Sequence, residues 1–184
     1  MTAAHRPWAA DLLHLWFHQL RPKHWFGRND AVDALLARRF APLIGKFQRR
    51  PPQDFLRDPL TARAAILLFD QVPRNAFRDS PRAFATDRLA AALTRAMLAK
   101  RWDRPLTRAQ RQFVLMPLMH SEAIADQRLS VARFAANGDG GRHGFARSHF
   151  GMVARFGRFP HRNALLGRKS SAAELRAIAA GNHW

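Results

Sequence analysis

The sequence predicts an all-α protein of seven to eight helices packed as antiparallel hairpins. Apolar residues recur with the helical period along the whole 184-residue chain, and no segment alternates with the two-residue period of a strand. Capping residues and helix stops separate the apolar stripes, and the loops between them are short. A chain of this length is expected to form a single domain, residues 1–184, with a proper hydrophobic core.

The first two helices have clear start signals. Pro7 suits the first turn of a helix that carries the apolar residues of "WAADLLHLWFHQL". Asn29 is a good N-cap for a second helix, whose apolar stripe runs from Val32 to Phe47. Pro42 falls inside this stripe, and we expect it to kink or interrupt the helix.

Two further helices are expected on either side of a short turn. Asp58 and Pro59 open a helix through "LTARAAILLFDQV", and Pro73 is expected to end it. Ser80 and Pro81 are expected to start the next helix, which carries the apolar residues of "AFATDRLAAALTRAML".

The C-terminal half is predicted to be helical in the same way. A threonine and a glutamine with capping-box spacing precede "RQFVLMPLMH", in which Pro117 predicts a break or kink. Ser121 is the expected cap of "EAIADQRLSVARFAAN". The stretch "GDGGRHG" is expected to be the most flexible of the chain. A last short helix begins at a second capping box, formed by Ser171 and Glu174.

Composition limits the classes of function. The chain has no cysteine, which excludes disulfides, thiolate catalysis and cysteine zinc sites. Its longest apolar run, "AAILLF", is far too short to span a membrane, and its N-terminus lacks the apolar core of a signal peptide. We expect a soluble, cytoplasmic protein with no membrane partner. The net charge of +18 favours a polyanionic partner such as RNA, although arginine-rich composition alone also produces such a charge.

Three groups of polar residues are candidates for a site. Asp70 lies at the end of an apolar run, where the helix dipole disfavours a carboxylate, so Arg74 or Arg78 is expected to compensate it, either as a structural ion pair or beside a ligand. Glu122 and Asp126 are four residues apart and are expected to share a helix face. With His120 upstream they suit acid-base chemistry or a hard metal, although acidic residues are common near helix N-termini for electrostatic reasons alone.

The third group lies in residues 140–173, which contain no Asp or Glu and are expected to be strongly electropositive. His149 falls on the apolar stripe of its helix, as either a core or a cleft residue. His14 and His18 have metal-pair spacing, but no third distant ligand is indicated, and we expect neither a metal nor a cofactor. No glycine-rich phosphate loop, Walker lysine, nucleophile elbow or dinucleotide fingerprint occurs.

Four strings carry a resemblance to a known family. They are "LWF" with "HWFGRND", "AAILLFDQVPRNAFRDSPRAFATDRLAAAL", "FVLMPLMHSEAIADQRLSV" and "VARFGRFPHRNALLGRKSSAAE". Together they make the chain, over about residues 11 to 182, similar to the bacterial family known as domain of unknown function 924. The resemblance implies a tetratricopeptide-like helical fold and no defined activity. The polar motif residues that it implies are Asp70, Gln71, Arg74, Asn75, Arg78, Thr86, Asp87, His120, Ser121, Glu122, Asp126, His149, Arg155, Arg158, His161, Arg162 and Asn163.

This sequence differs from the family pattern in two places. Relatives usually continue after the equivalent of His149 with His-Arg-Asp, whereas here Phe150 and Gly151 follow, and the family's "FWFG" is "LWFH" in this chain. The leading hypothesis is that the motif residues line one polar cleft that binds a small anionic ligand, with histidine or glutamate available for proton transfer. Its catalytic candidates are His120, Glu122, Asp126 and His149. Its ligand-binding candidates are Asp70, Arg74, Asn75, Arg155, Arg158, His161, Arg162 and Asn163.

Two alternatives to this hypothesis remain open. In the first, the chain is a peptide- or RNA-binding helical-repeat module that uses its basic surface. In the second, the motif residues form buried ion pairs that fix the packing of the helices.

Overall fold

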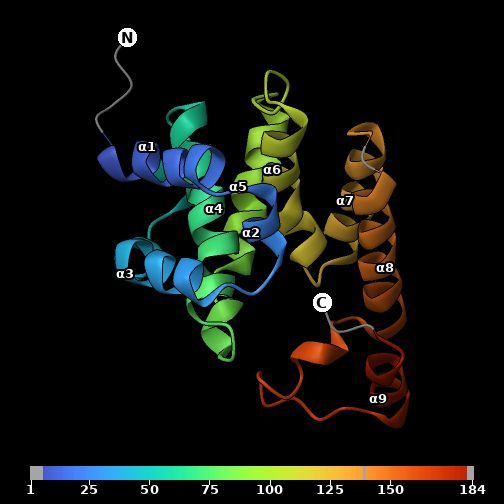
Figure 1. Cartoon of the computed structure of the whole chain (residues 1–184). Helices are drawn as coiled ribbons and strands as arrows, with labels where there is room; N and C mark the ends of the chain where they lie inside the picture. The colour runs from blue at the N-terminus through green and yellow to red at the C-terminus, as the bar shows by residue number, and fades with distance from the viewer. Residues whose placement is uncertain (1–5, 139, 182–184) are drawn as a thin grey trace. The chain divides into compact units, whose positions relative to one another are not determined.

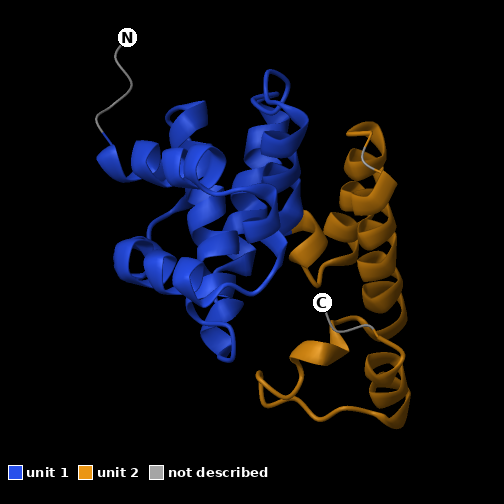
Figure 2. Ribbon diagram, in the orientation of Figure 1, with its two compact units in different colours: residues 1–117 blue, residues 118–184 orange. Residues whose placement is uncertain are grey.

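A computed structural model describes residues 6–138 and 140–181. Within these ranges it contains nine α-helices, short 3-10 and π-helical turns, and no β-strand, which confirms the all-α prediction (Figure 1). The chain divides into two compact units, Met1–Pro117 (unit 1) and Leu118–Trp184 (unit 2), shown in blue and orange in Figure 2. The expected tetratricopeptide-like arrangement and the single domain stay predictions.

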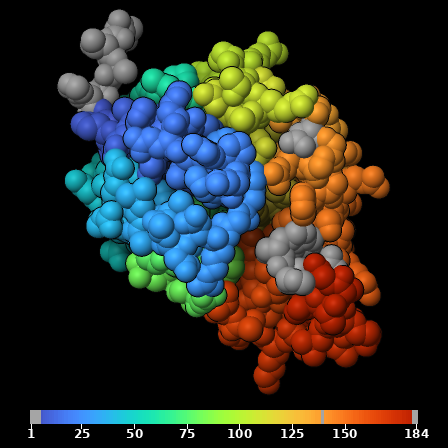
Figure 3. Space-filling model, in the orientation of Figure 1, coloured from blue at the N-terminus to red at the C-terminus, as the bar shows by residue number. Residues whose placement is uncertain are grey.

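Unit 1 is built around one central helix. It contains α1 (Pro7–His14), α2 (Pro22–Phe26), α3 (Asp30–Phe47), α4 (Pro59–Ala76), α5 (Asp87–Ala99) and most of α6 (Arg108–His120). Helix α4 packs against α1, α3 and α5 (Figure 1). Every residue of α4 from Thr61 to Pro73 is buried, as expected for a helix that is covered on all sides. The space-filling view shows the segment from α1 to α3 as a continuous surface of this unit (Figure 3).

The predicted N-caps of this unit are confirmed, because each depends only on neighbouring residues. The side chain of Asn29 accepts a hydrogen bond of 3.1 Å from the amide of Val32, and that of Asp58 accepts one of 2.8 Å from the amide of Thr61. Thr107 and Gln110 form the expected reciprocal capping box.

Helix α4 does not end at Pro73, so that prediction is wrong. The helix continues to Ala76, with Pro73 in its interior. Proline has no amide hydrogen for the carbonyl of Phe69, four residues earlier. The hydroxyl of Thr86 donates a hydrogen bond of 2.6 Å to that carbonyl instead, and this bond compensates for the missing helical one.

The other two prolines do not interrupt their helices. Helix α3 runs through Pro42 and α6 runs through Pro117, and the expected kink at each of them stays a prediction. Ser80 and Pro81 begin only a short 3-10 turn, Pro81–Ala83, and α5 begins later, at Asp87.

Unit 2 contains the last residues of α6 together with α7 (Ile124–Ala136), α8 (Gly140–Phe156) and α9 (Ala172–Ala179). Helices α7 and α8 pack side by side, and α9 packs against the 3-10 turn Pro160–Arg162. Ser171 and Glu174 form the predicted capping box of α9. Gly157 follows α8 with φ of 69°, a left-handed conformation that ends the helix at no steric cost.

One expectation for unit 2 is wrong. Ser121 does not cap α7, which begins three residues later; its hydroxyl accepts from the amide of Ala123 and donates to the carboxylate of Asp126 instead. In "GDGGRHG", Asp139 lies outside the described residues, and the glycines from Gly140 onward belong to the first turns of α8; the expected flexibility of this stretch stays a prediction. None of the helices in the described ranges has both the length and the apolar character that crossing a membrane requires.

Candidate functional site

The motif residues at the end of α4 form a network of ion pairs. Both terminal nitrogens of Arg74 donate to the carboxylate of Asp87, at 2.8 and 2.9 Å, and one also lies 3.3 Å from the carboxylate of Asp70. Asp70 is fully buried. Burial alone would lower the pKa of Arg74, but the charges of Asp87 and Asp70 outweigh this effect and raise it. The expected pairing of Asp70 with Arg74 is therefore present, and α5 contributes the second carboxylate.

A second ion pair lies one turn further along the chain. Arg78 donates to both carboxylate oxygens of Asp33, at 2.5 and 2.9 Å, and also to the side-chain oxygen of Asn75. The side-chain amide of Asn75 donates to the carbonyl of Gln71. The pair of Arg78 with Asp33 connects the end of α4 to α3. Within unit 1, Arg74 and Arg78 therefore each form a bidentate pair with a carboxylate, and Asn75 bonds to the end of its own helix.

In unit 2, Glu122 lies in the segment before α7. The expectation that it shares a helix face with Asp126 is wrong, because the helix begins at Ile124. Its carboxylate accepts hydrogen bonds from the amide of Phe159 at 2.8 Å and from Arg168 at 2.8 and 2.9 Å. Burial alone would raise the pKa of Glu122, but the bonds from Arg168 and Phe159 outweigh it and lower this pKa. Glu122 is therefore ionised and well bonded at neutral pH.

A comparable ion pair anchors α9. Arg158 donates to both carboxylate oxygens of Glu174, at 2.7 and 3.0 Å. The side-chain amide of Asn163 donates to Ser170 and to Glu174. The hydrogen bond from Arg158, with that from the Ser171 amide, lowers the pKa of Glu174 to about 2. The sequence predicts only a capping role for Glu174, whereas in the structure it also pairs with Arg158, sixteen residues away.

Basic side chains gather around the buried ring of Phe159. The ring centroids of His149 and His161 lie 5.4 and 5.7 Å from that of Phe159, and the guanidinium carbon of Arg162 lies 4.5 Å from it. His120 lies 6.3 Å from His149, centroid to centroid. We call His120, His149, His161 and Arg162, together with Phe159, the Phe159 cluster. The cluster contains two of the four predicted catalytic residues, His120 and His149, and two of the predicted ligand-binding residues, His161 and Arg162.

The protonation of His149 is set by these neighbours. Its Nδ1 lies 2.8 Å from the carbonyl of Phe145 on the same helix, so this nitrogen carries the hydrogen. Burial, followed by the charge of His120, lowers the pKa of His149 to about 3, with smaller contributions from Arg162 and His161. His149 is therefore neutral at pH 7 in a strongly electropositive setting.

The remaining predicted residues lie elsewhere. The guanidinium of Arg155 is exposed and lies 4.9 Å from the ring of Phe156. Asp126 is buried beside Ser121. Sequence reasoning missed Phe159 and Arg168, and no local signal marks them, because their roles come from contacts with residues 37 and 46 positions away. Across the described part of the chain, no group of three or more His, Asp or Glu side chains is placed to hold a metal ion.

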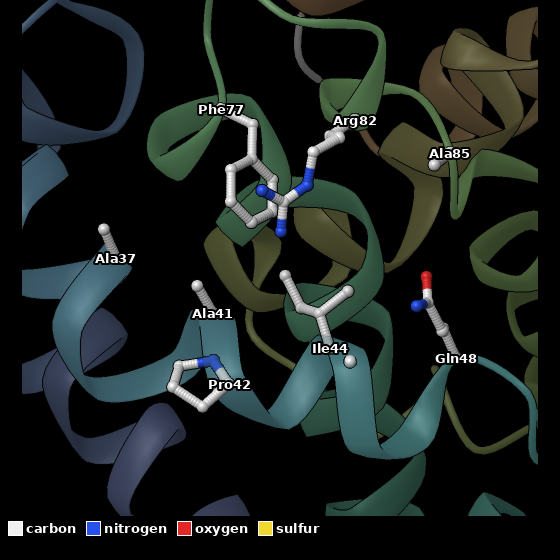
Figure 4. Close-up of a pocket in the computed structure, with 9 residues that line it drawn as sticks. Ala37, Ala41, Pro42, Ile44, Gln48, Phe77, Arg82 and Ala85 are labelled. Carbon is white, nitrogen blue, oxygen red and sulfur yellow. The ribbon is translucent and has the colours of Figure 1, made fainter.

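Unit 1 also has a surface groove of about 340 Å³. Figure 4 shows Ala37, Ala41 and Ile44 along α3, with Phe77 and Arg82 on the opposite side. The guanidinium carbon of Arg82 lies 3.8 Å from the centroid of the Phe77 ring. Unlike Arg74 and Arg78, Arg82 forms no ion pair with any described residue.

The comparisons with known proteins agree with the strings quoted above. The family model of a bacterial protein of unknown function, DUF924, matches residues 12–182. A solved structure, that of the protein of unknown function ATU0120 from Agrobacterium tumefaciens, is similar with a TM-score of 0.86 and 32% sequence identity, over 94% of this chain and 97% of that chain. A comparison with curated proteins gives no match. The chain belongs to the bacterial DUF924 family.

Proposed function

We propose that this protein binds a small anionic ligand at the Phe159 cluster. The observation that carries the proposal is the gathering of His149, His161 and Arg162 around the Phe159 ring, with His120 next to His149. Imidazolium and guanidinium groups are the side chains that best donate to phosphate and carboxylate oxygens.

The local charge balance supports an anion as the ligand. Glu122 also lies near Arg162, close enough to feel its charge, but its carboxylate is already bonded by Arg168 and by the amide of Phe159. The lowered pKa of His149 reflects both burial and the repulsion of its basic neighbours. An anion placed among these groups would reduce that repulsion, and it would favour uptake of a proton by His149.

The ion pairs elsewhere have a different role in this proposal. Arg74, Arg78, Arg158 and Arg168 each already donate to a carboxylate of this chain in bidentate fashion. We assign Arg74 and Arg78 to fixing helix ends within unit 1, and Arg158 and Arg168 to holding the segment around the Phe159 cluster within unit 2.

Calorimetric titration with sulfate and with inorganic phosphate tests the proposal. His149→Gln and Arg162→Gln are expected to weaken binding at least tenfold. Arg147→Gln is the matched control, because it removes a charge from an exposed position of the same helix and is expected to change the affinity less than twofold. Since Arg162 is buried and its variant is at risk of misfolding, His161→Gln, at a half-buried position, provides a third variant. Binding that survives in all three folded variants would refute the proposal.

The groove of Figure 4 favours a second candidate function, the docking of a short acidic peptide. Its floor on α3 is apolar, and Arg82, which forms no ion pair with any described residue, offers a positive charge there. Fluorescence anisotropy with a labelled peptide of alternating leucine and glutamate tests this candidate. Arg82→Gln is expected to weaken binding severalfold, and an unchanged affinity would exclude it.

A further inference from the structure

Arg63 is a buried arginine without an acidic partner. It lies on α4, is 9% exposed, and forms no ion pair with any described residue. Within the described part of the chain its Nε finds no hydrogen-bond acceptor, and burial lowers the pKa of its guanidinium. Its guanidinium carbon lies 5.5 Å from the centroid of the Phe17 ring. Buried arginines are almost always paired, so an uncompensated one indicates an anionic partner that this segment of the chain does not itself provide.

Unit 1 holds two more buried donors. Among the described residues, the indole Nε1 of Trp16, a residue only 1% exposed, has no acceptor, and neither has the side-chain nitrogen of Gln112, 7% exposed. Trp16 and Phe17 both pack on Phe113, with ring centroids 5.3 and 5.9 Å from it, and Gln112 precedes Phe113 in α6. Buried polar groups are normally bonded, so three such donors, on residues that contact these rings or adjoin them in the chain, need an explanation.

The rings of this cluster extend from the interior to the surface. Trp25 lies 5.1 Å and Phe26 lies 6.0 Å from Phe113, centroid to centroid, and Phe26 is 45% exposed. The segment that carries these rings lies on the surface of unit 1 (Figure 3). An exposed aromatic face above buried donors suits a ligand with an apolar ring and a polar end.

The backbone at Trp16 and Phe17 is unusual. Residues Leu15–Gln19 form a single π-helical turn that follows α1. Such turns are rare and occur frequently at functional sites, because they shift side chains away from the positions of a regular helix. Here the turn contains both the Trp16 donor and the Phe17 ring beneath the Arg63 guanidinium.

We propose that this part of unit 1 is a second ligand site, which takes a small aromatic carboxylate. The carboxylate accepts hydrogen bonds from Arg63, with Trp16 and Gln112 as further donors, and the aromatic ring packs against Phe17, Trp25 and Phe26. The site shares no residue with the Phe159 cluster and does not depend on it.

Calorimetric titration of the full chain with benzoate, and with acetate for comparison, tests this site. Benzoate is expected to bind at least tenfold more tightly than acetate, because acetate lacks the ring. Arg63→Met is expected to weaken benzoate binding at least tenfold. Arg38→Met, the same change at an exposed position of α3, is the matched control and should leave the affinity unchanged. The titrations are also made in His149→Gln, in which anion binding at the Phe159 cluster is expected to be at least tenfold weaker, so the preference for benzoate over acetate that persists there belongs to this second site.

A second pair of variants covers the case that Arg63→Met fails to fold. Phe26→Ala alters an exposed ring, and Gln112→Leu removes a donor while keeping the side-chain volume; each is expected to weaken benzoate binding severalfold. The proposal is overturned if benzoate does not bind at millimolar concentration, if acetate binds as tightly, or if the folded variants bind benzoate as well as the unmodified protein does.

Discussion

The hydroxyl of Thr86 donates a hydrogen bond of 2.6 Å to the carbonyl oxygen of Phe69, the helical acceptor that Pro73 leaves without a donor. Both residues are buried, so water does not replace this bond easily. The bond explains how α4 continues past a proline in its interior. It also assigns a structural role to a threonine that the family resemblance marks only as a motif residue.

We therefore expect Thr86→Val to destabilise the protein by about 1–3 kcal/mol, the usual cost of leaving a buried carbonyl unbonded. Urea denaturation measures this loss. Pro73→Ala restores the missing backbone amide, so Thr86→Val should cost clearly less in that background. Equal costs in both backgrounds would show that the two residues act independently.

Arg74→Met is expected to destabilise the protein by about 3–5 kcal/mol, because it leaves the carboxylates of Asp70 and Asp87 buried without their cation. The control is Arg28→Met, whose pair with Asp30 is largely exposed to solvent and is therefore expected to contribute little to stability. Chemical denaturation of both variants measures their losses in the free energy of unfolding. Similar losses in the two would contradict the structural role assigned to Arg74.

Acid stability should depend on Arg158. The pKa of Glu174 is lowered from 4.5 to about 2, chiefly by Arg158, so the folded state binds fewer protons than the unfolded state between these pH values. The resulting stabilisation is fully present above pH 4.5 and is lost as the pH falls towards 2.

Arg158→Met should therefore be destabilised most above pH 4.5, and its stability should approach that of the unmodified protein near pH 2. Denaturation curves over this pH range measure the convergence. Arg155→Met, at an exposed position without an ion pair to any described residue, is the control. Parallel pH profiles for Arg158→Met and the unmodified protein would disprove the effect.

Gly45→Ala is expected to stabilise the protein by about 0.5–1 kcal/mol, because glycine in a helix interior is unfavourable and a Cβ built here meets no atom within 4 Å. Gly157→Ala should have the opposite sign, since its φ of 69° is unfavourable for a residue with a side chain. Thermal denaturation of both variants tests the contrast, and stabilisation by both would contradict it.

The sequence predicts helices and their caps well where the signal is local. Asn29, Asp58 and Ser171 cap helices in the expected way, because a cap requires only the next few residues. The effect of a proline on its helix is predicted less well, because it depends on residues that are distant in the sequence. Whether Pro73 ends its helix depends on Thr86, which is distant in the sequence and reaches the open carbonyl only in the folded chain.

The candidate site shows the same limit. The sequence predicts the four basic residues of the Phe159 cluster but not Phe159 itself, because the gathering of His149, His161 and Arg162 around one ring depends on how the segment after α8 folds back. Likewise, nothing near Arg78 in the sequence indicates that Asp33, forty-five residues earlier, is its partner. Charge pairing between distant segments is decided by packing, which periodicity does not encode.

Calorimetric titration with sulfate at pH 4, in two buffers of different ionisation enthalpy, tests the central claim most directly. His149, with a pKa of about 3, is still mostly neutral at this pH, and a bound anion that raises its pKa by about one unit or more makes it take up a proton from the buffer. We predict an observed enthalpy that differs between the buffers in the unmodified protein and in Arg147→Gln, and that is nearly equal in His149→Gln. Sulfate binding with the same enthalpy in both buffers, or no sulfate binding at all, would contradict the account.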